Sequence, residues 1–265
     1  MSSRKDLLMR KFSVFVKNDA KSQNIKTKIT ERLLAHNYGV DEEQPDLVVC
    51  VGGDGTILSA VHHYLHQLES IEFVAIHTGT LGFFTDYTEN EVDRCIQDII
   101  DDNVYEVFSS YLLEANVNDY TVYALNEIRV ENILRTQVLD IYIDDEFFET
   151  FKGNGMCLST QAGSTAYNRS LDGAVIDSGI RVMQLTEIAG IQDSKHRSLR
   201  VPYLLQENRK VTFVGDDFTN SFICYDHKNL SLDNVSRIEC KMSNKRVKFV
   251  RYRKYSYLDR VRNLY

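Results

Sequence analysis

Short apolar runs alternate with amphipathic stretches along the first hundred residues. The runs Lys11–Val16, Leu47–Val51 and 72–76 are typical of buried strands. Apolar side chains recur at helical spacing after each run, at residues 25, 29 and 33, from 57 to 68 and from 92 to 100, and Gly39 is expected to end the first helix. This βαβαβ order predicts an α/β domain with a parallel sheet, in which ligands bind at the carboxyl ends of the strands.

The pattern changes at Val104, where short alternating or β-branched runs begin. These runs predict strands at residues 114–117, 124–130, 138–143, 210–214, 222–225 and 246–252. Asp144 and Asp145 are expected at the turn of a hairpin. We therefore predict an α/β domain at residues 1–103, a mainly antiparallel β domain at 104–248, and a final strand or tail at 249–265 that returns to the first domain.

Composition narrows the class of protein. The chain has 265 residues, a formal charge of −7 and a pI near 5.5, which argues against general nucleic-acid binding. The five cysteines are widely spaced and form no CxxC pair, so we expect reduced core residues and no metal site. No apolar run suits a signal peptide or a membrane span, and we expect a cytoplasmic protein that makes no membrane contact.

Two clusters of charged or titratable residues have ordinary interpretations. In the basic stretch 241–265, aromatic and charged residues alternate, which predicts a terminal strand with a solvated basic face. Binding of polyanions is the alternative. His62 and His66 lie one helical turn apart, but on the polar side of their helix, so we expect solvated side chains and not a metal site.

A glycine-lined turn, Gly52-Gly53-Asp54-Gly55-Thr56, follows the second apolar run. Glycine lets the backbone approach a ligand closely. The turn leads into a helix N-terminus, where unpaired N–H groups and the helix dipole favour an anion. We interpret it as a phosphate-binding loop that carries one carboxylate. The alternative is an ordinary tight turn with Asp54 or Thr56 as N-cap.

A second glycine-rich segment, GNGMCLSTQAGSTAY, occupies residues 153–167. Its small hydroxyl side chains can donate to a ribose or phosphate, and Tyr167 offers a ring that can stack on a base. A turn and helix start capped by Ser164 is the alternative. The order of GGDGT at 52–56, Asn126-Glu127 and GSTAY at 163–167 resembles the ATP-NAD kinase family, in particular its compact bacterial type.

The resemblance implies a kinase that phosphorylates the 2′-hydroxyl of the adenosine ribose of NAD to give NADP. ATP or another phosphoryl donor would supply the phosphoryl group, with a divalent cation such as magnesium that comes mainly with the nucleotide phosphates. Asp54 would accept the hydroxyl proton. Members of the family assemble as dimers and tetramers, so the resemblance also implies a homo-oligomer, with a homotetramer as the expected form.

The resemblance also implies which residues bind NAD. Asn126 would read the adenine edge and Glu127 would accept from ribose or base donors, although a strand end with a solvated acid is the alternative for this pair. Gly55 would leave room for the ribose. The residues expected to wall the adenosine site are Thr165, Ala166, Tyr167, Asn168, Arg169 and Ser170.

Further positions would contact other parts of the dinucleotide. Lys152 and Asn154 would approach the nicotinamide ribose, and Ala189 would close the pocket, from the same or a neighbouring subunit. His227 would lie near the bound phosphate or ribose, with an ordinary turn at Asp226-His227 as the alternative.

The chain departs from the family pattern at two places. Asn154 stands where the family usually has Asp, and Gln161-Ala162 replaces Pro followed by Thr or Ser. Asn154 keeps the shape of aspartate but replaces charge-assisted hydrogen bonds by neutral ones of about half the strength, so NAD affinity is expected to be lower or differently tuned.

Two other functions fit part of the pattern. The GGDGT loop is shared with lipid kinases of the diacylglycerol and sphingosine type, which would phosphorylate a lipid instead of NAD. A non-catalytic NAD(P)-binding regulator would account for Asn154 and Gln161-Ala162, although Asp54 speaks against it. Neither a Walker lysine loop nor GxGxxG occurs in the chain, so a P-loop ATPase and a hydride-transferring Rossmann enzyme are not supported.

Overall fold

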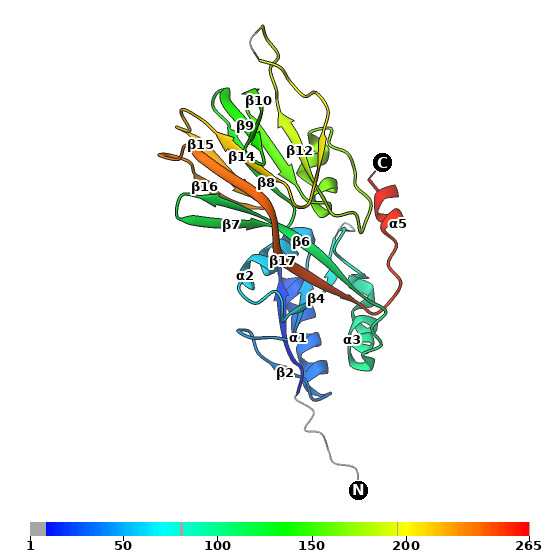
Figure 1. Ribbon diagram of the computed structural model, residues 1–265. Helices are drawn as coiled ribbons and strands as arrows, with labels where there is room; N and C mark the ends of the chain where they lie inside the picture. Colours follow the sequence, from blue (N-terminus) through cyan, green and yellow to red (C-terminus); the bar gives the residue numbers. More distant parts are fainter. Residues whose placement is uncertain (1–8, 80–81, 195, 265) are drawn as a thin grey trace. The chain divides into compact units, whose positions relative to one another are not determined.

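The computed structural model describes residues 9–79, 82–194 and 196–264, and the chain divides into two compact units. Unit 1 contains the chain up to Ser110 and again from Arg246, and unit 2 runs from Tyr111 to Lys245. Two long strands, β6 (Glu106–Val117) and β17 (Arg237–Arg251), belong in part to each unit (Figure 1). Each unit is described by itself below.

Unit 1 is an α/β unit around a parallel sheet, as the βαβαβ pattern predicted. In the order β17-β4-β3-β1-β2 every neighbouring pair is parallel, and β5 pairs in parallel with the end of β4. Besides β6 and β17, the strands are β1 (Lys11–Val16), β2 (Gly39–Val40), β3 (Leu47–Val51), β4 (Glu72–His77) and β5 (Tyr87–Thr88). The helical segments are α1 (Ala20–Leu34), α2 (Asp54–His63), η1 (Glu89–Glu91), α3 (Val92–Asp101) and α5 (Tyr257–Arg262).

Side-chain alternation along the strands assigns the helices to the two faces of this sheet. Val49 and Val74 join the apolar cluster that also contains the inner stripes of α1 and α3, which contact one another. The preceding residue of β4, Phe73, faces the other way and packs against Tyr64, the C-cap residue of α2. The sheet is therefore covered on both faces, as a parallel sheet requires.

Unit 2 contains two antiparallel layers. One is a six-stranded sheet in the order β13-β12-β11-β8-β15-β16, and the other contains β10, β9, β14 and the first part of β17, together with the β6–β7 pair. The strands are β7 (Tyr120–Ala124), β8 (Glu127–Asn132), β9 (Gln137–Ile143), β10 (Glu146–Gly153), β11 (Gly155–Ser159), β12 (Val182–Ile188), β13 (Tyr203–Gln206), β14 (Lys210–Val214), β15 (Ser221–Tyr225) and β16 (Lys228–Ser231). Two short helical segments, η2 (Ala162–Thr165) and α4 (Tyr167–Ser170), follow β11.

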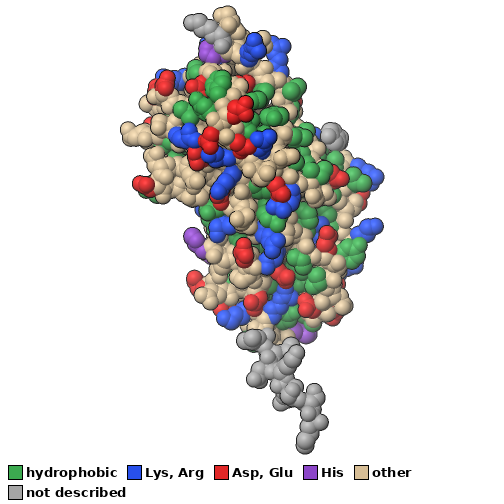
Figure 2. Space-filling model, in the orientation of Figure 1, with side chains coloured by type: hydrophobic (Ala, Val, Ile, Leu, Met, Phe, Trp, Pro, Cys, Tyr) green, Lys and Arg blue, Asp and Glu red, His purple; other side chains and the backbone are tan. Residues whose placement is uncertain are grey.

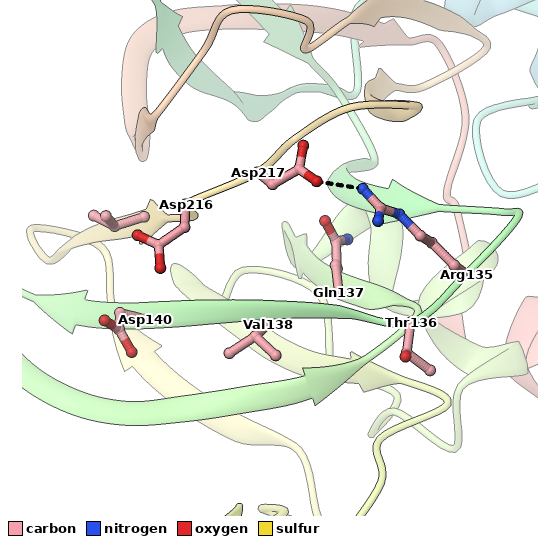
Figure 3. Close-up of a pocket in the computed structure, with 8 residues that line it drawn as sticks. Arg135, Thr136, Gln137, Val138, Asp140, Asp216 and Asp217 are labelled. Atoms are coloured by element: carbon pink, nitrogen blue, oxygen red, sulfur yellow. Dashed lines mark hydrogen bonds and ion pairs between the residues drawn. The ribbon is translucent and has the colours of Figure 1, made fainter.

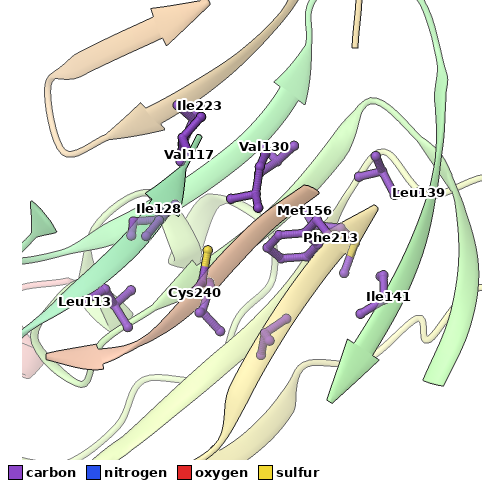
Figure 4. Close-up of a cluster of buried hydrophobic side chains, with 14 of the residues drawn as sticks. Leu113, Val117, Ile128, Val130, Leu139, Ile141, Met156, Phe213, Ile223 and Cys240 are labelled. Carbon is purple, nitrogen blue, oxygen red and sulfur yellow. The ribbon is translucent and has the colours of Figure 1, made fainter. Parts of the chain in front are cut away.

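The core of unit 2 is formed by the inner faces of the two layers. Ile128, Val130 and Met156 of the six-stranded sheet belong to one buried cluster with Ile141 and Phe213 of the other layer (Figure 4). On the opposite face of β8, the alternate residues are polar, and they include Glu127. The mainly antiparallel class predicted for this part of the chain is confirmed.

Several element boundaries differ from the sequence prediction. Helix α1 ends at Leu34, and Gly39 begins β2, so the prediction that Gly39 ends the helix is wrong. The single run at 124–130 is two strands, because the backbone N–H groups of Leu125 and Asn126 donate to the Asp226 side chain instead of a neighbouring strand. Asp144 and Asp145 form the predicted β9–β10 turn, with φ of 52° and 67°, the left-handed conformation that a two-residue hairpin turn requires.

The basic C-terminal stretch is only partly the solvated strand that its alternation predicted. Strand β17 does extend to Arg251, but the Arg251 side chain is buried and faces the buried Asp86 (Nε to Oδ1, 3.6 Å). Lys241 pairs with Glu114 and Arg253 with Glu91. On the face shown in Figure 2, basic and acidic side chains are interspersed. No helix of the described residues has the length and apolarity needed to cross a membrane.

Candidate functional site

Asp54 is the first residue of α2, and only Gly52 and Gly53 separate it from the carboxyl end of the central strand β3. The N-cap is Gly53, with no side-chain cap bond, so the interpretation of Asp54 as an ordinary N-cap is wrong. Gly52 leaves room for Thr56, since a Cβ at residue 52 would lie 2.1 Å from Thr56 Oγ1. The turn thus presents a carboxylate at a helix N-terminus that does not use it as a cap.

A loop after β4 holds the Asp54 carboxylate. The backbone N–H of Phe83 donates to Oδ2 (2.9 Å) and that of Phe84 to Oδ1 (3.2 Å). Gly82 makes this approach possible, because a Cβ there would lie 2.2 Å from Oδ1. The carboxylate is therefore fixed by two backbone donors from a neighbouring strand end.

The environment of Asp54 makes it a better base than an exposed aspartate. Burial raises the pKa of Asp54, which outweighs the lowering by the two amides of Phe83 and Phe84 and by the nearby Arg260 and His77. A raised pKa brings a carboxylate closer to the operating pH, where a general base is most effective.

In unit 2, the Asn126-Glu127 pair is held by buried side chains. The Asp226 carboxylate accepts from the backbone N–H of Leu125 (2.9 Å) and of Asn126 (2.7 Å). Thr160 donates its hydroxyl to Leu125 O (2.7 Å), and its backbone N–H donates to Asn126 O (2.9 Å). These bonds fix the backbone of the pair without using its side chains.

The side chains of the pair are buried and have unsatisfied acceptors. Asn126 is 8 % exposed and Glu127 5 %, and neither Asn126 Oδ1 nor Glu127 Oε2 has a hydrogen-bond partner. Burial, followed by the charge of Asp226, raises the pKa of Glu127 to about 7. Glu127 is therefore not the solvated strand-end acid of the alternative interpretation. Buried polar atoms without partners are uncommon, and Asn126 and Glu127 are consecutive residues that each carry such an atom, so the pair is a candidate for accepting hydrogen bonds from a ligand.

The GSTAY segment packs directly on this pair. A Cβ at Gly163 would lie 2.0 Å from Asn126 O, so only glycine allows the contact. Tyr167 is 36 % exposed and its ring lies under the Arg129 guanidinium (4.2 Å). The structure thus brings Asn126, Glu127 and Tyr167 into one region of unit 2.

The neighbouring residues at the end of η2 and in α4 differ in exposure. Thr165, Ala166 and Arg169 are partly buried, and Ser170 is exposed and donates to Tyr167 O (2.6 Å). Asn168 is fully buried, where its Oδ1 accepts from Thr186 of β12 (2.8 Å). Asn168 therefore fastens α4 to the sheet.

Lys152, Asn154 and Ala189 lie together at the ends of β10 and β12. The backbone N–H of Asn154 donates to Ile188 O (3.0 Å), and a Cβ at Gly153 would lie 2.7 Å from Ala189 O. Lys152 pairs with Asp193 (2.9 Å). The Asn154 side chain donates through Nδ2 to Asn132 O (3.0 Å), which an aspartate could not do.

Other candidate residues have ordinary placements. His227 is exposed in the β15–β16 hairpin turn, where Asp226 has φ of 53°. All five cysteines are buried and free, as expected. Among the described residues, no three or more His, Cys, Asp or Glu side chains gather where they could hold a metal ion. Gln161 donates to Ile176 O (3.0 Å), a contact that proline could not make.

Unit 2 also contains a pocket of about 230 Å³, and none of the candidate residues lines it (Figure 3). Its lining includes Asp140, Asp216 and Asp217, and its one arginine, Arg135, is paired with Asp217 (2.5 Å). Three carboxylates and a neutralised cation do not suit a phosphate-bearing ligand.

Sequence reasoning missed the residues that position the site. The 82–84 loop contacts Asp54 from 29 residues away, and Asp226 contacts Asn126 from 100 residues away. A signal for the loop was present in Gly79 and Gly82, which follow the strand next to β3 and so lie at the same edge of the parallel sheet.

Unit 1 has a carboxylate at a helix N-terminus after a parallel strand, and unit 2 has a buried acid and amide near an aromatic ring; both are features expected of a phosphotransferase of the nucleotide-kinase class. The family model of the ATP-NAD kinase N-terminal domain matches residues 8–104, and that of the ATP-NAD kinase C-terminal domain matches residues 125–252. The chain belongs to the ATP-NAD kinase family.

Relatives and solved structures agree with this assignment. The NAD kinase of Levilactobacillus brevis is 37 % identical over 95 % of this chain and 96 % of its own length. NAD kinase 1 of Bacillus subtilis is 35 % identical over 96 % and 97 %. The fold is similar to that of yeast NADH kinase complexed with NADH (TM-score 0.79, 20 % identity, 97 % of this chain and 86 % of the other). It is also similar to that of an NAD kinase from Archaeoglobus fulgidus in complex with ATP (TM-score 0.74, 23 % identity, 97 % of both chains).

Proposed function

We propose that the protein is an NAD kinase that transfers a phosphoryl group from ATP to the 2′-hydroxyl of the adenosine ribose of NAD, giving NADP. Full-length similarity to curated NAD kinases supports the activity. The observation that carries the chemistry is the Asp54 carboxylate, which has a raised pKa, caps no helix and is held by two amides.

Asp54 accepts the proton of the attacking hydroxyl as the new O–P bond forms. Phosphoryl transfer has a loose transition state, so the protein acts mainly by aligning the acceptor oxygen and shielding charge. Gly55, which is exposed at the start of α2, leaves space beside Asp54 for the ribose. A divalent cation on the donor phosphates supplies charge neutralisation.

In this proposal the adenosine is bound mainly by Asn126 and Glu127, whose buried acceptor atoms have no hydrogen-bond partner among the described residues. Asn126 pairs with the adenine edge through its amide, Glu127 Oε2 accepts from a ribose or base donor, and Tyr167 stacks on the base. The other residues proposed for binding are Thr165, Ala166, Asn168, Arg169 and Ser170 around the adenosine, Lys152, Asn154 and Ala189 toward the nicotinamide ribose, and His227 near a phosphate or the ribose.

We further propose a cytoplasmic homo-oligomer, with a homotetramer as the expected state. The β domain at residues 104–248 is proposed as the NAD-binding domain. Sedimentation of the purified protein with and without NADP tests the assembly, and a monomer under both conditions would contradict it.

A panel of acceptors and donors tests the function. Purified protein is incubated with magnesium, one of ATP or polyphosphate, and one of NAD, NADH or diacylglycerol in micelles. We expect NADP from NAD and ATP, with the new phosphate located at the adenosine ribose by phosphorus NMR. Phosphorylated lipid without NADP would establish a lipid kinase, and tight NADP binding without turnover would establish a non-catalytic regulator.

Asn154→Asp tests the departure from the family pattern. The carboxylate offers a charge-assisted acceptor to the dinucleotide, so KM for NAD is expected to change several-fold, more than kcat does. The same change removes the Nδ2 bond to Asn132 O and is expected to lower the free energy of unfolding by about 1 kcal/mol. Steady-state kinetics and urea denaturation measure the two effects. Unchanged KM and kcat would remove Asn154 from the site.

A further inference from the structure

The loop that holds Asp54 is itself bonded on its other side by the C-terminal segment. Its N–H groups at Phe83 and Phe84 face the carboxylate, and its carbonyl groups face the chain after β17. Three donors of that segment bond to these carbonyls: Tyr255 Oη to Phe83 O (2.7 Å), Arg260 Nη2 to Thr85 O (2.8 Å), and the Arg253 guanidinium to Asp86 O.

The C-terminal segment is anchored well enough to act as a support. Arg253 also pairs with Glu91 (2.6 Å) and stacks over the buried Tyr87 (4.2 Å). The Tyr255 ring lies under the buried Arg251 guanidinium (3.6 Å). Burial raises the pKa of Tyr255 to about 12, so its hydroxyl remains a donor throughout the working pH range.

We propose that Tyr255 and Arg260 are positioning residues for phosphoryl transfer, because they fix loop 82–86 and, through its two amides, the Asp54 carboxylate. The inference rests on the proposed role of Asp54 as the base. A base must lie within hydrogen-bond reach of the proton it takes, and a misplacement of about 1 Å can cost about 100-fold in rate. Among the described residues, Tyr255 donates to Phe83 O and Arg260 donates to Thr85 O, and these bonds hold the loop from the side opposite Asp54.

Arg260 has a second, electrostatic effect on the base. The charged or titratable side chains that face Asp54 are Arg260 from α5 and His77 from β4, and both favour the ionised carboxylate. Removing the Arg260 charge therefore raises the pKa of Asp54 further. Since the base must be ionised to accept a proton, the acidic limb of the kcat profile then moves to higher pH.

Tyr255→Phe tests the hydrogen bond to the loop. We expect kcat to fall about ten-fold with KM for ATP nearly unchanged, because the carboxylate is displaced while phosphate contacts remain. Tyr38→Phe is the matched control: Tyr38 Oη also donates to a backbone carbonyl of unit 1, that of Ile99 (2.9 Å), away from the loop. Both variants lose one such bond and about 1 kcal/mol of stability, but only Tyr255→Phe is expected to lose rate.

Arg260→Gln tests the electrostatic effect. We expect the acidic limb of kcat to move to higher pH in this variant, and Arg260→Lys, which keeps the charge, to return it toward the wild-type position. Arg262→Gln is the control, because Arg262 lies in the same helix but pairs only with the exposed Asp259 (2.7 Å) in the contacts described. His77 is unchanged in all three.

The outcomes separate this inference from the proposed function. NADP formation by the wild type, its loss in Asp54→Asn, and the rate and pH changes above would support both. If the wild type and Asp54→Asn behave as expected but Tyr255→Phe matches Tyr38→Phe and Arg260→Gln matches Arg262→Gln, the inference is overturned and the function stands. A wild type without NADP formation overturns the function itself.

Discussion

Replacing Asp54 by asparagine is expected to lower kcat for NADP formation by a factor between about 10² and 10⁴, the usual contribution of a general base. Asparagine keeps the shape of the side chain and one acceptor for the loop amides, but it cannot take a proton. KM for ATP is expected to stay within a few-fold of wild type, since the carboxylate does not bind the donor phosphates. Steady-state assays at several pH values measure both parameters.

The free energy of unfolding should change much less than the activity. Burial disfavours the ionised form of Asp54, as its raised pKa indicates, and in Asp54→Asn the gain from a neutral side chain offsets the loss of one of the two loop hydrogen bonds, so the free energy of unfolding is expected to change by no more than about 1 kcal/mol. The matched control is Asp19→Ala. Asp19 also stands at a helix N-terminus, but it is a true N-cap whose carboxylate accepts from Ser22 N (2.8 Å).

The control variant is expected to lose about 1 kcal/mol of unfolding free energy and keep its activity. Asp54→Asn is expected to lose no more unfolding free energy than the control does, and to lose its activity. If Asp54→Asn retains wild-type kcat, Asp54 is not the base, and the loop amides that hold it have only a structural role.

Sequence periodicity was sufficient for the architecture and for the turn that carries Asp54. The alternation of apolar runs and helical stripes identified β1, β3, β4 and their parallel order, and the glycines of GGDGT marked a backbone that must approach a ligand. It was not sufficient for the end of α1, where the chain left the helix five residues before Gly39.

The contacts that give the site its geometry could not be read in the same way, because they join distant segments. Asp226 was interpreted as one half of an acid–histidine turn, yet its carboxylate is occupied by the amides of Leu125 and Asn126. The alternating basic stretch suggested a solvated face, but Arg251 is buried beside Asp86. In each case the local sequence pattern is compatible with an exposed side chain. The side chain is buried because a residue distant in sequence provides its partner.

The buried Glu127 carboxylate is expected to lower the free energy of unfolding of the protein without ligand. A carboxylate whose pKa is about 7 in the folded state and near 4.5 in the unfolded state binds more protons when folded between these pH values. The folded state therefore loses stability as pH rises from about 4.5 to about 7, and the loss remains at higher pH. At ~1.4 kcal/mol per pH unit it amounts to at most about 3 kcal/mol.

Glu127→Gln is expected to remove this pH-dependent loss while weakening NAD binding. The variant should be more stable than wild type by about 1–3 kcal/mol at pH 8 and nearly equal to it at pH 5, as measured by urea denaturation without ligand. Glu146→Gln, at an exposed position of β10, should show no such difference. Loss of the charged acceptor should raise KM for NAD by about ten-fold, because hydrogen bonds to charged groups are worth about 1.5–3 kcal/mol. Equal stability of Glu127→Gln and wild type at pH 8, together with an unchanged KM, would mean that this buried acid is satisfied within the folded chain and that the adenosine is bound elsewhere.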